Sequence, residues 1–249
     1  MNDRQEKIYS ILKEQGSVSV EHLKKVIFAS EATLRRDLTR MEQDGLLLRT
    51  WGGAILSSGI TSDPPLFIRS NANVNEKNAI VKLALPFVQN NMTVFLASGT
   101  TVTKLAALFY KLDNLTVITN GIDAAEALKS ASTSKIILTG GMLYENYDLT
   151  GTLTESAVEQ FNADIFFFSC SGMTADGFTS MDMARLEVIK KMRQNSKKTV
   201  LLCDTSKVGK RYTYRGFGFD KIDHVIMDKK PKDTELVRAI GRKLIIPNN

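Results

Sequence analysis

The chain has 249 residues, of which 43% are apolar and 24% charged, and it carries a formal net charge of +6. This is the composition of a folded globular protein, and the length predicts two domains, of which the larger can bury a substantial core. No apolar run approaches the roughly 18 residues of a membrane span, and the polar N-terminus is unlike a signal peptide. The only two cysteines, Cys170 and Cys203, each follow an apolar run, which favours reduced core thiols over a disulfide framework. We therefore expect a cytoplasmic protein with no membrane partner.

The first 29 residues predict two helices followed by a tight turn. Apolar residues recur at helical spacing from Ile8 to Leu12, and Gly16 ends this first helix. Ser19 is placed to cap a second helix through its hydroxyl. Residues 28–29 then make a short turn, so the segment has the helix, turn and helix order of a DNA-binding motif.

The residues from position 30 onward predict the helix that would enter a DNA major groove. Ser30 has the chemistry of an N-cap, and Leu34, Leu38 and Met41 recur at i, i+4 and i+7, which forms one narrow buried stripe. The other side of the helix carries small, hydroxylic and guanidinium groups, namely Ala32, Thr33, Arg35, Arg36, Thr39 and Arg40. Arginine binds guanine bidentately, threonine meets thymine methyls or phosphate, and alanine lets the backbone approach. The alternative for this stretch alone is a solvated helix held by Arg–Asp pairs.

Two short apolar runs after this helix predict a β-hairpin. Gly45 supplies a helix stop, and residues 46–50 and 54–56 have the composition of two strands joined by a turn. A hairpin that follows a recognition helix is a wing, which brings Arg49 and Trp51 near the phosphates. The sequence therefore predicts a winged helix-turn-helix.

The predicted DNA-binding domain spans residues 1–57 and is barely basic. It holds nine Lys and Arg against eight Asp and Glu, so DNA affinity must depend on which phosphates its arginines reach. Its sequence resembles the N-terminal signature of the DeoR family of bacterial transcription regulators, and Ala29 departs from it where the family more often has valine. The positions that carry the resemblance are Arg4, Ile8, Leu12, Ser30, residues 33–38 and the wing arginine before Gly52-Gly53-Ala54. The resemblance implies binding to a double-stranded DNA operator.

The remaining chain predicts a linker and then an α/β domain over residues 76–249. Residues 58–75 are polar, and Pro64 and Pro65 stiffen them into an extended spacer. Helical patterns follow at 77–89, 102–112, 122–130, 155–161, 183–195 and 234–242. They alternate with short apolar runs at 93–97, 115–119, 135–139, 164–169, 199–203, 224–227 and 243–246. Continuous apolar runs imply strands covered on both faces, hence a largely parallel sheet.

Small polar residues stand where five of these strands end. In a parallel α/β sheet, ligands bind beyond the carboxyl ends of the strands. The first run ends in Ser98, Gly99, Thr100 and Thr101 and opens into a helix, which makes an anion cradle without the pattern of a nucleotide P-loop. The other ends carry Asn120, Gly140, Gly141, Ser171, Gly172, Asp204 and Lys207. Each alone is ordinary turn chemistry, but together they predict one site, in which the lysine supplies a point charge.

These landmarks also resemble the effector-binding domain of the DeoR family, so the resemblance covers nearly the whole chain. It implies a fold similar to ribose-5-phosphate isomerase and a phosphorylated sugar or related anionic metabolite as effector, held by residues 98–101 and Lys207. The chain departs from the family at Ala97, where an acid is usual, and at Arg185 and Ile189, where Glu and Lys are common. These departures put the usual sugar in doubt, and Arg185 is a candidate ligand for another anionic group.

The expected function is that of a transcription regulator, most simply a repressor of sugar or carbohydrate metabolism genes. We expect a homodimer or homotetramer that places two recognition helices on a symmetric operator, with no cofactor, metal or catalytic residue. Residues 185–215 hold ten positive residues against two acids, which is either a solvated face or an attraction for an anionic ligand or flanking DNA.

The sequence is compatible with two functions other than a transcription regulator that responds to an effector. A sugar-phosphate isomerase needs a carboxylate base, and the loop after the fourth strand has none, although Asp176, Asp182 and Glu187 follow. With only His22 and His224, a metal cluster or a Ser-His-Asp triad is not expected. The other alternative is a DNA-binding scaffold whose α/β domain only oligomerises and binds no effector.

Overall fold

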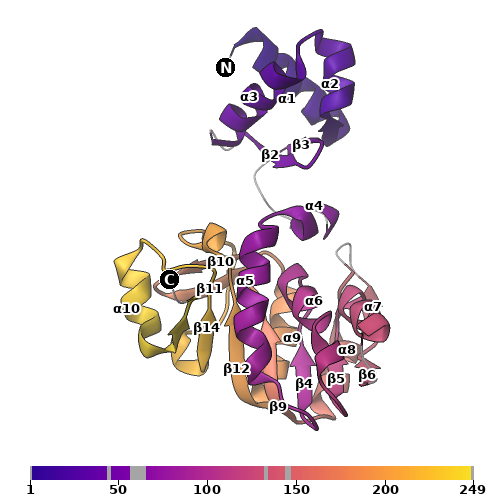
Figure 1. Cartoon of the computed structure of the whole chain (residues 1–249), viewed down its shortest axis with the longest axis vertical. Helices are drawn as coiled ribbons and strands as arrows, with labels where there is room; N and C mark the ends of the chain where they lie inside the picture. The colour runs from indigo at the N-terminus through magenta and orange to yellow at the C-terminus, as the bar shows by residue number, and fades with distance from the viewer. Residues whose placement is uncertain (1, 44–45, 57–65, 132–133, 144–146, 248–249) are drawn as a thin grey trace. The chain divides into compact units, whose positions relative to one another are not determined.

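The computed structural model describes residues 2–43, 46–56, 66–131, 134–143 and 147–247. It divides into two compact units, Met1–Ala72 and Asn73–Asn249 (Figure 1). The predicted helix stop at Gly45 and the two prolines of the predicted linker lie outside the described residues. Within that predicted linker, α4 (Leu66–Asn71) is a short helix.

Besides α4, the N-terminal unit combines three helices with a small antiparallel sheet of strand order β1-β3-β2. Its elements are α1 (Asp3–Gln15), β1 (Ser17–Ser19), α2 (Val20–Ile27), α3 (Glu31–Gln43), β2 (Leu47–Thr50) and β3 (Gly53–Leu56). Its core includes the three apolar positions predicted on α3, since Leu34, Leu38 and Met41 are all buried. The predicted helices and hairpin are confirmed. Strand β1, which pairs with β3, was not predicted, because three residues are too few to show an alternating pattern.

Local side-chain chemistry sets the ends of these helices. Ser19 accepts a hydrogen bond from the His22 amide at 3.0 Å, and Ser30 accepts one from the Thr33 amide at 3.2 Å. Both serines are therefore N-caps, as their sequence positions predicted. Phe28, with φ of 53°, takes the left-handed conformation that turns the chain between α2 and α3.

The second unit is built on a seven-stranded sheet of order β15-β14-β12-β9-β4-β5-β6, in which every pairing is parallel. The strands are β4 (Thr93–Leu96), β5 (Thr116–Thr119), β6 (Lys135–Leu138), β9 (Ala163–Phe168), β12 (Ser196–Leu202), β14 (His224–Ile226) and β15 (Leu244–Ile245). Each corresponds to one of the seven predicted apolar runs, so the predicted parallel sheet is confirmed.

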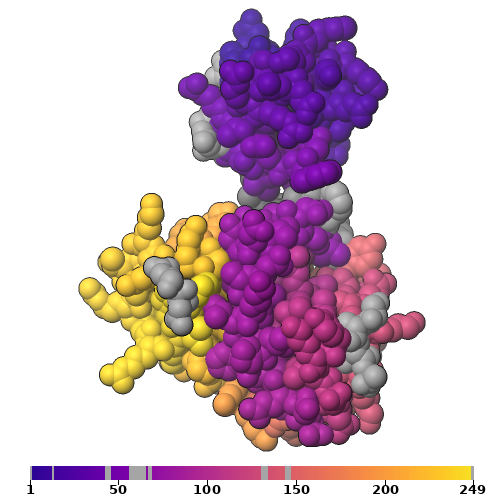
Figure 2. Space-filling view, in the orientation of Figure 1, coloured from indigo at the N-terminus to yellow at the C-terminus, as the bar shows by residue number. Residues whose placement is uncertain are grey.

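Helices cover both faces of this sheet, which gives a three-layer α/β architecture. On one face lie α5 (Val74–Ala84), α6 (Thr100–Ala106) and α7 (Ile122–Ala131), and their apolar residues join one buried cluster with alternate strand residues. Figure 2 shows α5 beside α6 on this face, and the two helices are in contact. On the other face lie α8 (Thr152–Glu159), α9 (Met183–Gln194) and α10 (Thr234–Ile240), over the second cluster. Strand β9 serves both, because Ile165 and Phe167 face one cluster while Phe166 and Phe168 face the other.

Short 3₁₀ helices and hairpins complete the unit. The 3₁₀ helices are η1 (Leu85–Phe87), η2 (Phe109–Lys111), η3 (Thr205–Lys207), η4 (Phe219–Lys221) and η5 (Gly241–Lys243). The predicted helix at 77–89 divides into α5 and η1 where Pro86 interrupts it. The short strands are β7 (Met142–Leu143), β8 (Leu149–Thr150), β10 (Gly172–Thr174), β11 (Gly177–Ser180) and β13 (Tyr214–Arg215), none of them predicted. Within the described ranges, no helix has the length and apolar character needed to cross a membrane.

Candidate nucleic-acid interface and effector site

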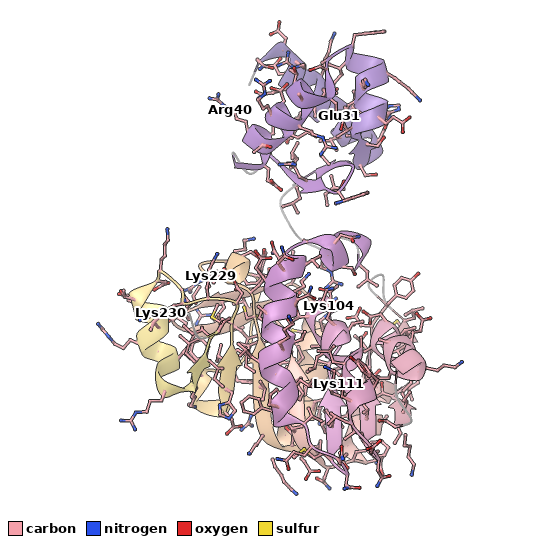
Figure 3. All side chains as sticks on the ribbon, viewed as in Figure 1. Glu31, Arg40, Lys104, Lys111, Lys229 and Lys230 are labelled. Carbon is pink, nitrogen blue, oxygen red and sulfur yellow. The ribbon has the colours of Figure 1, made fainter. Side chains whose placement is uncertain are left out.

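The side of α3 opposite its leucines is exposed to solvent. Ala32, Arg35, Arg36 and Arg40 are exposed, while Thr33 and Thr39 are half-buried, as the helical spacing predicted. The side chain of Arg40, labelled in Figure 3, extends outward from the helix. This face therefore offers several guanidinium groups beside small side chains, which is the chemistry that contacts DNA bases and phosphates.

The arginines of α3 differ in their partners. Arg35 pairs with Glu31 one turn earlier, with its Nη2 atom 2.7 Å from Oε1. In the part of the chain that is described, Arg36 and Arg40 have no ion pair or hydrogen-bond partner through their side chains. Their guanidinium groups are thus available to a ligand, whereas Arg35 must break its ion pair with Glu31 before it can bind one.

The wing residue Arg49 is connected directly to α3. Its Nη1 atom donates a hydrogen bond to Oγ1 of Thr39 at 2.7 Å, and its amide donates to Oε1 of Glu42 at 2.9 Å. Thr39 in turn donates to the carbonyl of Arg35 at 2.8 Å. Trp51, at the hairpin turn, is 90% exposed. The structure thus brings Thr39 and Arg49 together, and Trp51 follows Arg49 by two residues at the exposed turn of the wing.

A buried polar contact orients α3 against α1. Asp37 points inward and is 7% exposed, and Nε of Arg4 donates to its Oδ2 atom. Nε2 of Gln5 lies 3.5 Å from the other carboxylate oxygen. The hydrogen bond that Arg4 donates to Asp37 raises the pKa of Arg4; burial opposes this shift, and the charge attraction of Asp37 adds to it. The sequence indicates Arg4 and Asp37 only through their family resemblance, since no local pattern joins positions so far apart in the chain.

In the second unit, the predicted anion cradle lies between β4 and α6. Ser98 follows the strand, Gly99 precedes the helix, and Thr100 and Thr101 occupy its first turn. Ser98, Thr100 and Thr101 are all buried, at 9%, 9% and 3% exposure. The Ser98 amide donates to Oδ1 of Asn120 at 2.8 Å, so the ends of β4 and β5 meet as the parallel topology predicted.

A buried charged cluster adjoins this cradle. Oγ of Ser98 lies 3.4 Å from Oδ2 of Asp148, and Nε of Arg185 donates to the same oxygen at 2.6 Å. Nδ2 of Asn120 donates to the carbonyl of Leu149 at 2.9 Å, which holds the chain beside Asp148 against β5. Sequence reasoning missed Asp148, because it stands in a short segment with no apolar pattern. Arg185, predicted as a ligand for an anionic group, already has this carboxylate as a partner.

Asp204 and Lys207 lie at the end of β12. Oδ1 of Asp204 accepts hydrogen bonds from the Ser206 amide at 3.1 Å and from Nδ2 of Asn73 at 3.2 Å, so this buried carboxylate fixes its own loop. Thr205 is held by Asp228, whose Oδ1 atom accepts from its amide at 2.7 Å. Lys207 is only half-buried, and no side-chain partner for it occurs in the described ranges.

Two of the predicted site glycines have a packing reason for their identity. A Cβ atom on Gly141, where φ is 123°, would lie 2.0 Å from Oγ1 of Thr154, and one on Gly172 would lie 2.3 Å from the Lys210 carbonyl oxygen. The Gly140 carbonyl accepts a hydrogen bond from Oγ1 of Thr154 at 2.7 Å. Ser171 is held through its amide by the Thr179 carbonyl, at 3.2 Å. These residues shape the loops at the carboxyl edge, and close packing explains the glycines at 141 and 172 without a ligand.

Carboxylates pair with half of the ten positive residues in the basic segment at 185–215. Five of its positive residues form ion pairs, namely Arg185, Lys190, Lys191, Lys197 and Arg211. These pairs favour the solvated-face interpretation for half of the segment's positive residues. Lys207, which has no such pair in the described ranges, lies just after β12 at the carboxyl edge of the sheet.

The two cysteines lie side by side, at the ends of β9 and β12. Their Sγ atoms are 3.6 Å apart, and Cys203 is buried. The hydrogen bond with Cys170 and burial raise the pKa of Cys203 well above its ordinary value, so this thiol stays protonated at neutral pH. Among the described residues there is no group of three or more His, Cys, Asp and Glu side chains that could hold a metal ion.

Comparison of the sequence with models of known domain families shows which family the chain belongs to. The sequence model of the DeoR-like helix-turn-helix domain matches residues 4–59, and that of the DeoR C terminal sensor domain matches residues 72–229. The chain belongs to the DeoR family. It is accordingly a transcription regulator with an N-terminal DNA-binding helix-turn-helix and a C-terminal sensor domain.

Named relatives of this DeoR-family protein match along nearly their whole length. The HTH-type transcriptional regulator GolR of Listeria innocua is 32% identical over 230 residues, covering 92% of this chain and 91% of the relative. The glycerol-3-phosphate regulon repressor of Escherichia coli K12 is 30% identical over 226 residues, covering 90% and 89%. The putative aga operon transcriptional repressor of Escherichia coli O157:H7 is 28% identical over 253 residues, covering 98% and 93%. These relatives are all transcription regulators.

Solved structures with similar folds are far more distant. Translation initiation factor eIF-2B of Pyrococcus horikoshii OT3 has a TM-score of 0.50 at 11% identity, covering 91% of this chain and 96% of that one. A D-ribose-5-phosphate isomerase in complex with phospho-erythronic acid has a TM-score of 0.41 at 14% identity, covering 53% and 52%. At such identities the likeness concerns the fold alone. The α/β assignment rests on the sheet topology and the sensor-domain match.

Proposed function

We propose that this DeoR-family regulator represses genes of sugar or carbohydrate metabolism and releases its operator when a phosphorylated sugar or related anion binds. The single observation that carries the proposal is the buried hydroxyl-lined loop at 98–101, in the same chain as an arginine-bearing recognition helix. Relatives named as repressors of a glycerol-3-phosphate regulon and of an aga operon support the metabolic setting.

The operator contact is assigned to the outer face of α3 and to the wing. Arg36 and Arg40, with which no described residue pairs, reach the bases or phosphates with their guanidinium groups, and Arg35 joins them by giving up Glu31. The small side chains of Ala32, Thr33 and Thr39 let the backbone of α3 come close to the DNA. Ser30 caps the helix at its N-terminus. Arg49 and Trp51 contact the flanking phosphates from the wing.

The effector phosphate is assigned to the loop at 98–101, with Lys207 as its countercharge. Buried hydroxyls and the amides of a helix's first turn suit a phosphate, which brings several acceptor oxygens and needs donors around them. Asn120 supports the loop from β5. The glycines at 140, 141 and 172, Ser171 and Asp204 shape the surrounding edge and are assigned to positioning rather than to direct contact.

The protein is proposed to act as a homodimer or homotetramer. Five large apolar side chains between β6 and α8 are exposed, namely Leu138, Met142, Leu143, Tyr147 and Leu153. Exposed apolar groups that gather in one stretch are typical of an interface between subunits. Association of two chains would place two recognition helices on a two-fold symmetric operator.

Catalysis is not part of the proposal. The three carboxylates that follow the loop after the fourth strand have other roles, since Asp176 pairs with Arg211 and Glu187 with Lys190. Asp182 caps α9 by accepting from the Arg185 amide at 2.9 Å. A general base must be free to take a proton from substrate, so these three acids are better explained as structural groups.

Electrophoretic mobility shift on duplex DNA from upstream of its own gene tests the proposal. We expect a retarded band that weakens as salt rises and is lost when an effective sugar phosphate is added, because effector and operator binding are linked. Failure to bind this DNA even in dilute salt would contradict the DNA-binding assignment. Binding that no phosphorylated compound alters, with no compound raising the melting temperature, would favour a sensor unit that only oligomerises.

A further inference from the structure

Asp148 is a buried carboxylate of which only one oxygen has hydrogen-bond partners among the described residues. It is 1% exposed, and its Oδ2 atom faces Nε of Arg185 at 2.6 Å and Oγ of Ser98 at 3.4 Å. Within the part of the chain that the structure describes, its Oδ1 atom is buried and has no hydrogen-bond partner. It is the one buried side-chain oxygen or nitrogen there in that condition.

An unsatisfied buried acceptor of this kind indicates a missing donor. Nearly all buried polar atoms in native proteins have a partner, and an acceptor that carries charge loses more than a neutral one when it is left bare. Donors are present near this carboxylate, but Arg185 and Ser98 both contact Oδ2, and no described residue donates to Oδ1. A ligand group that enters the site, or an ordered water that the ligand displaces, supplies the donor for such an atom.

The position of the open oxygen connects it to the proposed phosphate loop. Ser98, which contacts Asp148, is the first residue of that loop and also donates its amide to Asn120 at 2.8 Å. Asn120 and Asp148 are further held together through the chain, since the Leu149 amide donates to the Asn120 carbonyl at 2.8 Å. A ligand whose phosphate lies against the loop therefore has its neighbouring carbon atoms beside Asp148.

The charge balance indicates what kind of donor fits. Arg185 already pairs with Oδ2, so what Oδ1 lacks among the described residues is a hydrogen-bond donor rather than a countercharge. A neutral hydroxyl supplies the hydrogen bond without adding charge. We propose that Asp148 accepts a hydrogen bond from a hydroxyl group of the effector and thereby selects hydroxylated phosphate esters, with Arg185 holding the carboxylate in place. This inference rests on the proposed function of the same site.

Isothermal titration calorimetry on the full-length protein tests the assignment with named probes. The probes are inorganic phosphate, propyl phosphate, glycerol 3-phosphate, ribose 5-phosphate and glucose 6-phosphate. Propyl phosphate has the same three-carbon chain as glycerol 3-phosphate but no free hydroxyl. We expect at least one hydroxylated ester to bind the parent protein about tenfold to a hundredfold more tightly than propyl phosphate, the range for a hydrogen bond to a charged group.

The decisive variant is Asp148→Asn, whose amide can still accept from Arg185 and turns a donor toward the ligand. We expect the advantage of the hydroxylated ester over propyl phosphate to fall below about threefold in this variant, whereas the affinity for propyl phosphate itself should not fall. Asp176→Asn is the matched control, because it also breaks a carboxylate–arginine pair, and it should keep the advantage. If Asp148→Asn does not fold, Asp148→Asn with Arg185→Gln removes both charges together and replaces it.

The outcomes separate this inference from the proposed function. An undiminished advantage in the Asp148 variant overturns the inference while leaving phosphate sensing intact. An equal loss for propyl phosphate and the hydroxylated ester also overturns it, because Asp148 would then only maintain the loop. If the parent protein binds none of the five probes, the phosphate-sensing function itself fails and the inference falls with it.

Discussion

Arg36 on α3 is the residue at which the DNA-binding assignment can be tested most directly. Its side chain is exposed and has no partner within the described segments, so replacing it removes no contact that holds the fold. Arg36→Ala is expected to weaken operator binding by about 1–3 kcal/mol if the guanidinium reads a base, and to relax sequence preference there. Fluorescence anisotropy with operator and with one-base variants of it measures both. Arg211→Ala, in the other unit, is the control and should bind DNA as the parent does.

His224 gives the stability of the sensor unit a dependence on pH. Burial lowers the pKa of His224; Asp223 opposes this shift, while Lys198 and Lys243 add to it. The folded protein thus prefers the neutral ring, and the unfolded chain binds the proton more readily. Stability from this group is full above the ordinary pKa of about 6.5 and is lost as pH falls through the lower folded value.

The corresponding prediction compares melting temperatures at about pH 7.5 and pH 5.5. The melting temperature of the His224→Gln variant is expected to fall less between these two pH values than that of the parent, because glutamine has no ring that takes up a proton. The comparison is made between pH values because the variant also loses the ring contact with Phe87, at 4.8 Å between centroids. His22→Gln, which changes an exposed histidine on α2, should behave as the parent. If the melting temperature of the His224 variant falls as much as that of the parent, groups other than His224 cause the loss of stability at low pH.

At the scale of single elements, the first turn of α3 depends on its N-cap. Ser30 accepts from the Thr33 amide and shares a 2.8 Å hydrogen bond with the Thr33 hydroxyl. Ser30→Ala is expected to destabilise the start of α3 by about 1 kcal/mol, whereas Ser30→Gly should lose only a few tenths. Amide hydrogen exchange in α3 without DNA measures this, as an approximately fivefold faster exchange in the alanine variant. Equal exchange in the alanine and glycine variants would contradict a capping role.

The elements of the sheet differ in how far the sequence could predict them. Strand β9 was predictable because four successive buried residues, Ile165 to Phe168, can only be covered from both sides, which is the signature of a central parallel strand. The β7–β8 hairpin was not, because its two-residue strands are too short for any period to appear. The helix predicted at 155–161 begins earlier, at Thr152, since the polar Thr-Leu-Thr start shows no apolar face.

The same contrast explains which site residues could be found. The loop at 98–101 was predictable because a buried strand runs directly into a helix there, so hydroxyls at that junction lie at a helix start. The Asp148–Arg185 pair joins positions 37 residues apart, one on a short hairpin and one on α9, and no local spacing connects them. Arg185 was noticed only as a departure from the family pattern. Its partner needed the three-dimensional contact.

At the scale of the whole molecule, the exposed apolar residues between β6 and α8 make association testable. Leu153 is 73% exposed at the start of α8, so a charge there changes the surface without entering the core. Leu153→Glu is expected to shift the protein toward monomer, because a buried interface does not accept an unpaired charge. Light scattering after gel filtration measures the mass. Tyr110→Glu, at a 59% exposed aromatic outside this stretch, is the matched control and should keep the parent mass.

The oligomer prediction extends to DNA because a single recognition helix contacts only a half-site. A dimer on a symmetric operator gains from both half-sites at once, whereas a monomer must bind each separately. Leu153→Glu is therefore expected to lose operator affinity by at least tenfold while keeping the parent's affinity for an isolated half-site. Its sensor unit should also keep its melting temperature, which separates lost association from lost folding. Full operator affinity in a variant proved monomeric would mean that two recognition helices are not needed, and the assembly proposed for this regulator would be wrong.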